Sequence, residues 1–570
     1  MKTPSRPSNL SASSRLLKST FAVAFLPGLL FLLSIQPSHA GSATWNLNPI
    51  SSDWNTAANW TPPTVPNGPS DTATFDSSTT TDISPAPGTG SIEVDSIVFN
   101  PGASAYTITV PWYIGEFNYF LYISGTGIVN NSGVSQNFVN LEDDGAIFEN
   151  NATAGNLTVF SNPASANLDR SGGITFFLNN SNAANGTFIN EGDEPAGGST
   201  QFYDQASAGN ATIINEGTGP GDVIGGAAYF FGNSTAETAT IINEGGAVVG
   251  GGGGLTHLDN DSTAANGTFI NHGGTTEGAN GGLTEFIGGT SGNAILIADG
   301  TFSGFGAGRI AFDTSGGGGV PQVELFGTGA LEIGVSIART VTIGSIEGDG
   351  LVFLGRNNLE IGGNNLSTLF AGVIGGARGS LTKIGTSTLE LTGANIYTGG
   401  TTIEGGKLVV NNMTGSGTGI GIVQVNGGRL SGRGMIAGAV IVGSGSGAGA
   451  ALAPGRRGSK TDTLTIQGAL TFQFDSTYKF ELKSSTPTAD KVVANGVTIN
   501  NGAQVSPSDL DSAVLPPGTV FTVIGNTAAT PIVGTFANLA GGSIITIGNN
   551  TFQASYSGGD GNDLTLTVVP

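Results

Sequence analysis

The feature that most constrains the fold is a six-residue motif that recurs between residues 141 and 300. Each copy has a strand-like Thr-x-Ile-Asn core that ends in a Gly turn. The Asn positions of four copies are 25, 28 and 28 residues apart, namely Asn190, Asn215, Asn243 and Asn271. A period of this length, with short strands and Gly-rich turns, is typical of one coil of a β-helix. We therefore expect successive coils to stack at about 4.8 Å, with equivalent residues above one another.

Stacking predicts the role of these four Asn residues. Identical amides one strand apart bond to each other, so we expect a structural ladder of side-chain hydrogen bonds. The position after each Asn forms a second column, which contains Glu191, Glu216, Glu244 and His272. Like charges repel unless they splay into water or share a cation. Since Ca²⁺ takes six or more oxygens and each coil offers one carboxylate, we expect a solvated column.

Composition agrees with a β-solenoid. The 570 residues include 95 Gly and no Cys, only 11% are charged, and the net charge is −22. Leu, Glu and Lys at helical spacing are missing, which excludes helical bundles and coiled coils. A polyanion repels a phosphate backbone, so nucleic-acid binding is excluded as well. Without disulfides, an exported chain of this kind is stabilised by the apolar column that stacked coils bury.

Residues 1–40 have the layout of a secretory signal peptide. Four basic residues precede an apolar run from Phe21 to Ile35, and small residues flank a cleavage site after Ala40. A membrane anchor is the alternative, but the run is short for a span of about 20 residues and is broken by Pro27. Cleavage leaves 15 basic and 41 acidic residues, a net charge of −26 (15 − 41). We expect an exported protein at the cell surface or outside the cell, or in the periplasm, without a transmembrane segment after cleavage.

Residues 41–140 are predicted to form an N-terminal cap and the first coils. This segment contains Trp45, Trp54 and Trp60, followed by several Pro residues that belong in loops and edges. A cap covers the open edge of the first coil. The alternative is a ligand-stacking site in which the three Trp rings bind sugars.

Residues 380–411 carry a second, longer motif. Its characteristic residues are Leu381, Gly385, Leu389, Leu391, Gly393, Asn395, Tyr397, Gly399, Gly400 and Thr401. This segment closely resembles the autotransporter-associated β-strand repeat of exported bacterial passenger domains. Alternating apolar residues predict three strands with Gly corners, and every position has a coil-building role. The resemblance implies a passenger-like protein with a structural or adhesive role.

The remaining segments complete the predicted organisation. We expect Asn-ladder coils over 141–300, further solenoid over 301–379, Gly/Ala-rich coils over 412–460 and a closing β segment over 461–570. The last two also resemble segments that accompany the repeat. Neither a C-terminal membrane barrel nor an apolar sorting tail is expected, so the export route and anchoring stay open.

Candidate chemical sites are few. Glu142, Asp143 and Asp144 form a carboxylate cluster, which we expect to be a solvated turn, and Asp169 beside Arg170 an exposed pair. The turn Gly558–Asp563 nearly matches a Ca²⁺-binding repeat, but such sites need stacked tandem copies, which favours a hairpin. No nucleophile elbow, zinc motif or Cys site is present, so we expect no enzyme and no cofactor or metal.

The sequence thus predicts an all-β fold, a right-handed parallel β-helix of about 20 coils. The leading functional hypothesis is a non-catalytic, monomeric surface protein whose partners are glycans or other surface proteins. The alternative is a carbohydrate-binding or polysaccharide-degrading β-helix that uses the Trp residues or a face formed by Phe202, Tyr203, Phe230 and Phe231. A purely mechanical stalk is the third class.

Overall fold

The computed structural model describes residues 41–86, 90–111, 118–167, 170–193, 196–219, 225–302, 304–313, 316–334, 339–447, 449–455 and 460–570. The predicted signal peptide, 1–40, lies outside these residues. The chain divides into two units, Met1–His39 and Ala40–Pro570, and the second is the one described below.

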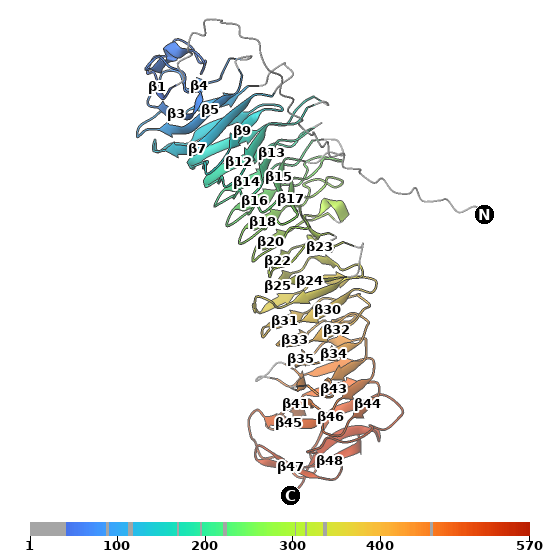
Figure 1. Ribbon diagram of the computed structural model, residues 1–570. Coiled ribbons are helices and arrows are strands. Elements are labelled where there is room, and N and C mark those ends of the chain that lie inside the picture. The colour runs from blue at the N-terminus through green and yellow to red at the C-terminus, as the bar shows by residue number, and fades with distance from the viewer. Residues whose placement is uncertain are drawn as a thin grey trace, which may run out of the picture. The chain divides into compact units, whose positions relative to one another are not determined.

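This second unit is an all-β, parallel β-solenoid, whose stacked strands are seen in Figure 1. It has about 17 turns. The predicted fold class is therefore confirmed, although the expected number of coils, about 20, was too high. The helices among the described residues are two short 3₁₀ helices, η1 (Ala57–Asn59) and η2 (Gly304–Gly306).

The first sheet has 15 strands, and from β1 onward each coil adds one further strand to it in the order of the sequence. In spatial order they are β2 (Trp60–Thr61), β1 (Ala43–Trp45), β3 (Gly68–Phe75), β5 (Ile92–Phe99), β7 (Phe120–Asn130), β9 (Gly145–Phe148), β11 (Ile174–Phe177), β13 (Ser199–Phe202), β15 (Ala227–Phe230), β17 (Leu255–Asp259), β19 (Leu283–Ile287), β21 (Arg309–Phe312), β23 (Ala330–Ile333), β26 (Leu351–Phe353) and β29 (Val373–Gly375).

The second sheet runs along the stack by parallel pairing of neighbouring coils, except that β42 pairs antiparallel with β41. Its strands are β4 (Asp82–Ile83), β6 (Thr107–Val110), β8 (Gln136–Asn140), β10 (Asn156–Asn162), β12 (Asn185–Asn190), β14 (Thr212–Asn215), β16 (Thr240–Asn243), β18 (Thr268–Asn271), β20 (Ile295–Ala298), β22 (Gln322–Leu325), β25 (Ser345–Gly348), β28 (Thr368–Phe370), β31 (Thr388–Leu391), β33 (Lys407–Val410), β35 (Gly428–Gly432), β38 (Ala450–Pro454), β41 (Ser476–Lys483), β42 (Thr488–Ala489) and β45 (Gln504–Asp509).

Two shorter sheets belong to the later coils and the C-terminal end. The third, of eight strands, contains β24 (Thr340–Ile343), β27 (Asn358–Ile361), β30 (Ser380–Lys383), β32 (Thr401–Ile403), β34 (Val423–Val425), β37 (Val440–Val442), β40 (Leu470–Phe472) and β44 (Val497–Ile499). The fourth, of seven strands, contains β36 (Met435–Ile436), β39 (Thr463–Ile466), β43 (Lys491–Ala494), β46 (Val520–Asn526), β49 (Asp563–Val568), β48 (Asn550–Gly558) and β47 (Ile544–Ile547).

The core is a column of inward side chains that the period-two alternation of each strand selects. In the first sheet, Phe148, Phe177, Phe202 and Phe230 stack in successive coils with ring centroids 4.7 to 4.9 Å apart. All four are fully buried. Such offset stacking adds to the stabilisation from burial, so one residue per coil builds a continuous apolar column.

The four predicted Asn residues form the ladder inside the second sheet. Nδ2 of Asn190 donates to Oδ1 of Asn215 at 2.7 Å, and Asn215 and Asn243 continue the series at 2.7 and 2.8 Å. Asn140 and Asn162 extend it towards the N-terminus. All these amides are buried, where hydrogen bonding is needed to offset their desolvation.

A column of Gly residues, which the sequence did not reveal, lies against this ladder. A Cβ on any of them would lie 1.8 to 2.2 Å from the backbone carbonyl oxygen of a ladder Asn. The Gly residues are Gly173, Gly198, Gly226, Gly254, Gly282 and Gly308. Their missing side chains therefore allow the turn after each Asn to approach the next strand closely.

The acidic column is solvated only in part. Glu216 is exposed, whereas Glu191 and Glu244 are half-buried. The loss of part of its hydration between neighbouring coils still raises the pKa of Glu216, and the charges of Glu191 and Glu244 raise it further. The like charges therefore interact, as their stacking requires.

The C-terminal end differs from the coils because β46, β47, β48 and β49 pair antiparallel. The turn Gly558–Asp563 joins β48 to β49, with Gly558 opposite Asp563, so it is the expected hairpin. Oδ1 of Asp563 accepts the backbone N–H of Asn526 at 2.9 Å. This hydrogen bond joins the beginning of β49 to the end of β46.

Candidate functional site

The Trp residues do not form a ligand-stacking site. Trp45, Trp54 and Trp60 are at most 1% exposed and contact each other edge to face at 5.0 Å. Their ring N–H groups donate to backbone carbonyls, for example from Trp54 to Pro66 at 3.1 Å. The sugar-binding interpretation of these residues is wrong, because the rings fill the core at the first coil and leave no face for a ligand.

The predicted Phe and Tyr face is half correct. Phe202 and Phe230 are fully buried, whereas Tyr203 and Phe231 are half-buried on the opposite side of the backbone. Strand alternation separates them, since adjacent residues point to opposite faces of a sheet. Only Tyr203 and Phe231 therefore remain as candidates for ligand contact.

These two rings belong to a longer aromatic column on the outer face of the first sheet. Tyr203 and Phe231 stack at 4.9 Å, and each ring in the column lies within 6.3 Å of another. Its members, all half-buried, are Phe120, Tyr122, Phe176, Tyr203, Tyr229, Phe231 and His257. Pairing of β7, β9, β11, β13, β15 and β17 in register brings them together.

The aromatic column leads into a groove that is centred on Arg309. Two adjoining hollows of about 800 and 430 Å³ share Leu283, Glu285 and Arg309. The larger one continues over Glu332 and Phe353. These five residues define what we call the arginine groove, which lies across β19, β21, β23 and β26.

Arg309 makes the electrostatic contacts of this groove. Its guanidinium lies 3.5 Å from a carboxylate oxygen of Glu332 and 5.0 Å from the ring centre of Phe305. Within the described part of the chain, its buried Nε meets no hydrogen-bond acceptor. An unsatisfied buried donor costs about 1–3 kcal/mol, so an oxygen supplied by a ligand would be stabilised there.

His257 and Glu285 connect the column to the groove. Nδ1 of His257 lies 2.7 Å from Oε1 of Glu285, and both side chains are about one fifth exposed, at 18% and 25%. Burial raises the pKa of the neighbouring Tyr229, and the charge of Glu285 raises it further. The hydroxyl of this tyrosine therefore stays protonated at neutral pH.

The groove also has an exposed apolar rim. Phe305, Phe353 and Ile396 are 70%, 49% and 64% exposed. Large apolar groups that gather beside convergent polar groups are characteristic of a binding site. The sequence did not reveal the groove, because each coil contributes only one or two of its five defining residues, and only the register between coils aligns them.

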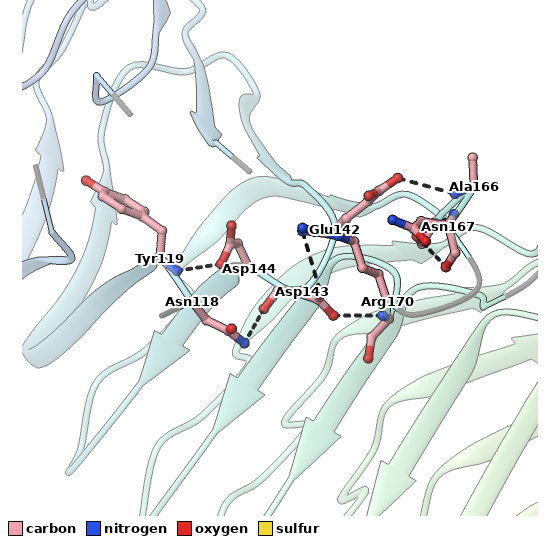
Figure 2. A network of polar contacts seen from close by, with 10 residues as sticks. Asn118, Tyr119, Glu142, Asp143, Asp144, Ala166, Asn167 and Arg170 are labelled. Carbon is pink, nitrogen blue, oxygen red and sulfur yellow. Dashed lines mark hydrogen bonds and ion pairs between the residues drawn. The ribbon is translucent and has the colours of Figure 1, made fainter. Parts of the chain in front are cut away.

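The carboxylate cluster is a structural turn, shown in Figure 2. Asp144 is buried and accepts the backbone N–H of Tyr119, while Asp143 lies 3.6 Å from Arg170. Glu142 accepts a backbone N–H of the next coil at 3.3 Å. The predicted turn is present, although Asp144 is not solvated, and the three carboxylates point to different partners. Asp169, the other half of the predicted pair, lies outside the described residues.

Two further observations on the described part of the chain concern metal ligands and membrane-spanning helices. No group of three or more His, Asp and Glu side chains converges as a metal site there. Neither helix in the described ranges is long and apolar enough to span a membrane.

Residues 380–411 fold into four strands, β30 to β33, where we expected three. Tyr397 is fully buried and shares a hydrogen bond of 2.6 Å with Thr401, and burial raises its pKa. Asn395 accepts the backbone N–H of Ile374 and donates to the carbonyl of Gly417, which joins it to the coils on both sides. The motif residues therefore build and connect coils.

Comparison with protein families matches residues 381–410 to the family described as passenger-associated-transport-repeat. The chain contains this transport repeat. The match confirms the resemblance for a segment of 30 residues (381 to 410) within the 570. No curated protein matches the chain.

Among solved structures, the chain is similar to the Haemophilus influenzae Hap adhesin, known from a crystal structure, with 10% sequence identity and a TM-score of 0.20. The match covers 86% of this chain and 64% of that chain. Since this TM-score is low, neither fold nor function is assigned from the similarity.

Proposed function

We propose that this protein is an exported, passenger-type β-solenoid that binds a glycan along the outer face of its first sheet. The observation that carries the proposal is the continuous aromatic column that leads into the arginine groove. Aromatic rings stack on the apolar faces of sugars, while Arg, Glu and Tyr groups bind hydroxyls. A polysaccharide repeats along its length, as these rings do from coil to coil.

Placement at the cell surface rests on the transport repeat. This repeat continues the same stack of coils, since its strand β30 pairs with β27 before the repeat and its strand β33 pairs with β35 after the repeat. Passenger proteins present such stacks outside the cell, where an extended face makes many weak contacts that add to strong binding.

Glycan binding is tested with the full chain on a glycan array, followed by titration of the best polysaccharide. We expect Tyr229→Ala and Phe231→Ala to weaken glycan binding about tenfold each, since each variant loses one aromatic ring of the stacking surface. The matched control is Phe326→Ala, a 43% exposed ring that follows β22 in the second sheet. Equal binding by all three variants, or no binding by the wild type, would overturn the proposal in favour of a mechanical stalk.

Surface placement is tested separately by protease treatment of intact cells. An antibody against the chain should detect its loss from cells or its recovery in the medium. Protection within the envelope would contradict a surface role, while leaving the groove as a periplasmic binding site.

A polysaccharide-degrading function is the second candidate, because Glu285 and Glu332 occupy the same column two strands apart. Two strand spacings place their Cα atoms about 10 Å apart. From such positions, flexible Glu side chains can bring their carboxyl groups to the separation of about 6.5–9.5 Å that inverting glycosidases use. Both carboxylates already contact a basic side chain, which favours binding over acid catalysis. Release of reducing ends by the wild type and its loss in Glu285→Gln would establish hydrolysis.

A further inference from the structure

The arginine groove has a small residue between its polar side chains. Glu285, Ala311 and Glu332 lie in register on β19, β21 and β23, so Ala311 separates the two carboxylate-bearing residues. Arg309 lies two residues before Ala311 on the same strand and therefore points to the same outer face. Since Ala311 carries a single methyl group, the longer side chains around it leave the larger hollow of the groove open above β21.

The charged groups of the groove compensate each other. Glu332 lies 3.5 Å from the guanidinium of Arg309, and Glu285 lies 2.7 Å from the histidine ring that ends the aromatic column. The third carboxylate in the lining, Asp313, interacts with Arg339, since burial lowers the pKa of this arginine and the charge of Asp313 opposes the decrease. Because each carboxylate lies near a basic group, neither an acidic nor a basic polymer has complementary charge to bind here, and a neutral glycan fits the groove best.

The same ion pairs keep hydrogen-bonding capacity for a neutral ligand. The side chains of Glu332 and Glu285 are 38% and 25% exposed, so their carboxylate oxygens can accept an N–H group from the groove. A guanidinium carries several N–H donors, and the Nε of Arg309 has no acceptor among the residues that the structure describes. A ligand group that donates on one side and accepts on the other therefore completes the polar contacts.

An exposed aromatic ring lies beside these polar groups. Phe305 lines the smaller hollow together with Arg309, and its ring centre is 5.0 Å from the guanidinium carbon. The residue is 70% exposed, so most of the ring is open to a ligand. An apolar group held next to the guanidinium would cover this ring and remove its surface from water.

We propose that the glycan bound in the arginine groove carries acetamido sugars, as a polymer of N-acetylhexosamine does. This inference rests on the proposed function. An acetamido group is uncharged, and its carbonyl oxygen, N–H and methyl group point in different directions. The carbonyl accepts from the guanidinium of Arg309, the N–H donates to Glu332 or Glu285, and the methyl group packs on Phe305. The hydroxyl of an unsubstituted hexose donates and accepts at a single atom and offers no methyl group.

The test is calorimetric titration of the full chain with two neutral oligosaccharides of equal length and identical β-linkage, one of N-acetylglucosamine and one of glucose. These ligands differ only in the acetamido group, so the ratio of their affinities reports its recognition. We expect the acetylated ligand to bind about tenfold more tightly, which is the value of one hydrogen bond to a charged group. Arg309→Ala should reduce this ratio to about one. The matched control, Arg433→Ala, removes an exposed cation that follows β35 in the second sheet and should keep the wild-type ratio.

Saturation-transfer NMR locates the contact on the sugar. We expect the acetamido methyl protons to receive more saturation than the ring protons, and Phe305→Ala to remove this difference. Because Phe305 is exposed, this variant keeps the test decisive if Arg309→Ala does not fold.

The outcomes separate this inference from the proposed function. Equal affinity of the wild type for the two oligosaccharides, or no transfer to the methyl protons, overturns the acetamido inference and leaves glycan binding intact. Binding of neither oligosaccharide, while another glycan on the array binds, overturns the inference alone as well. Binding of no glycan by the folded wild type overturns the proposed function together with the inference.

Discussion

Nδ2 of Asn215 donates to Oδ1 of Asn243, 28 residues further along the chain, at 2.7 Å. The same nitrogen donates to the backbone carbonyl of Leu255 at 3.0 Å, and Oδ1 of Asn215 accepts from Asn190. A single side chain thus joins three successive coils, and its loss affects bonds on both sides.

Asn215→Ala should lower the free energy of unfolding by about 1–3 kcal/mol, because buried partners in the neighbouring coils lose bonds. Thermal unfolding followed by circular dichroism measures the effect. Asn210→Ala, an exposed Asn in the same coil, should change it by less than about 0.5 kcal/mol. Equal melting temperatures of the two variants would show that the ladder adds no stability.

Gly254→Ala should be more damaging than its small size suggests. The new Cβ would lie 2.2 Å from the carbonyl oxygen of Asn215, so strands must move apart at a cost of about 1–3 kcal/mol or more. Gly219→Ala is the matched control, since its Cβ would meet only a side-chain oxygen of Asp193 at 3.6 Å. Comparable melting temperatures of both variants would contradict the close approach at Gly254.

Trp54→Ala should destabilise the N-terminal end without changing ligand affinity. Removing this fully buried ring costs about 3–5 kcal/mol, and Leu47→Ala, at a residue 58% exposed, should cost little. Hydrogen exchange of residues 41–110 reports the loss. A folded Trp54→Ala variant that keeps its stability and loses glycan binding would restore the sugar-stacking interpretation.

The pair of His272 and Asp299 predicts a pH-dependent contribution to stability. Nδ1 of His272 lies 2.9 Å from Oδ2 of Asp299, and this bond raises the pKa of the His and lowers the pKa of the Asp. Because the pKa of His272 is raised, the protonated ring stabilises the folded state at pH values below its ordinary pKa of 6.5. This stabilisation is lost as the pH rises through the pKa of His272 in the folded state. Because the pKa of Asp299 is lowered, its ionised carboxylate stabilises the folded state at pH values above its ordinary pKa of 3.8. This stabilisation is lost as the pH falls through the pKa of Asp299 in the folded state.

The pair therefore stabilises most between about pH 4 and 6.5. His272→Gln should lower stability at pH 5.5 by less than about 1 kcal/mol, because both side chains are partly exposed, and by less at pH 9. Unfolding midpoints at the two pH values provide the measurement. An identical difference at both would show that the pair does not titrate with folding.

The Asn ladder was predictable because residues one period apart in the sequence lie above one another when coils stack. The transport repeat was predictable from the resemblance of its motif residues. Asn190 and Asn215 have the same environment one coil apart, so their spacing in the sequence determines their contact. The repeat residue Tyr397 was expected to have a coil-building role, and it is fully buried in the core. What the sequence did not show was the column of Gly residues, since a missing side chain leaves no pattern of its own in a Gly-rich chain.

The Trp residues show why exposure was harder to predict than register. Trp45 and Tyr229 are both large aromatic residues in short strands, yet one is 1% exposed and the other is half-buried on the outer face. Which side of a strand faces the core depends on the coil as a whole, because a shift of one residue exchanges the two faces.

The all-β solenoid and the Asn ladder follow from local alternation and a fixed period in the amino-acid sequence, and the transport repeat follows from the resemblance of its motif residues to a known repeat. Only the tertiary structure placed Arg309 beside Glu332 and Lys407 beside Arg429. These residues are 22 or 23 positions apart in the sequence (429 − 407 and 332 − 309), and they meet because the backbone completes one turn in that distance. The register between coils, which the backbone hydrogen bonds set, therefore determines which charged side chains lie next to each other on this surface.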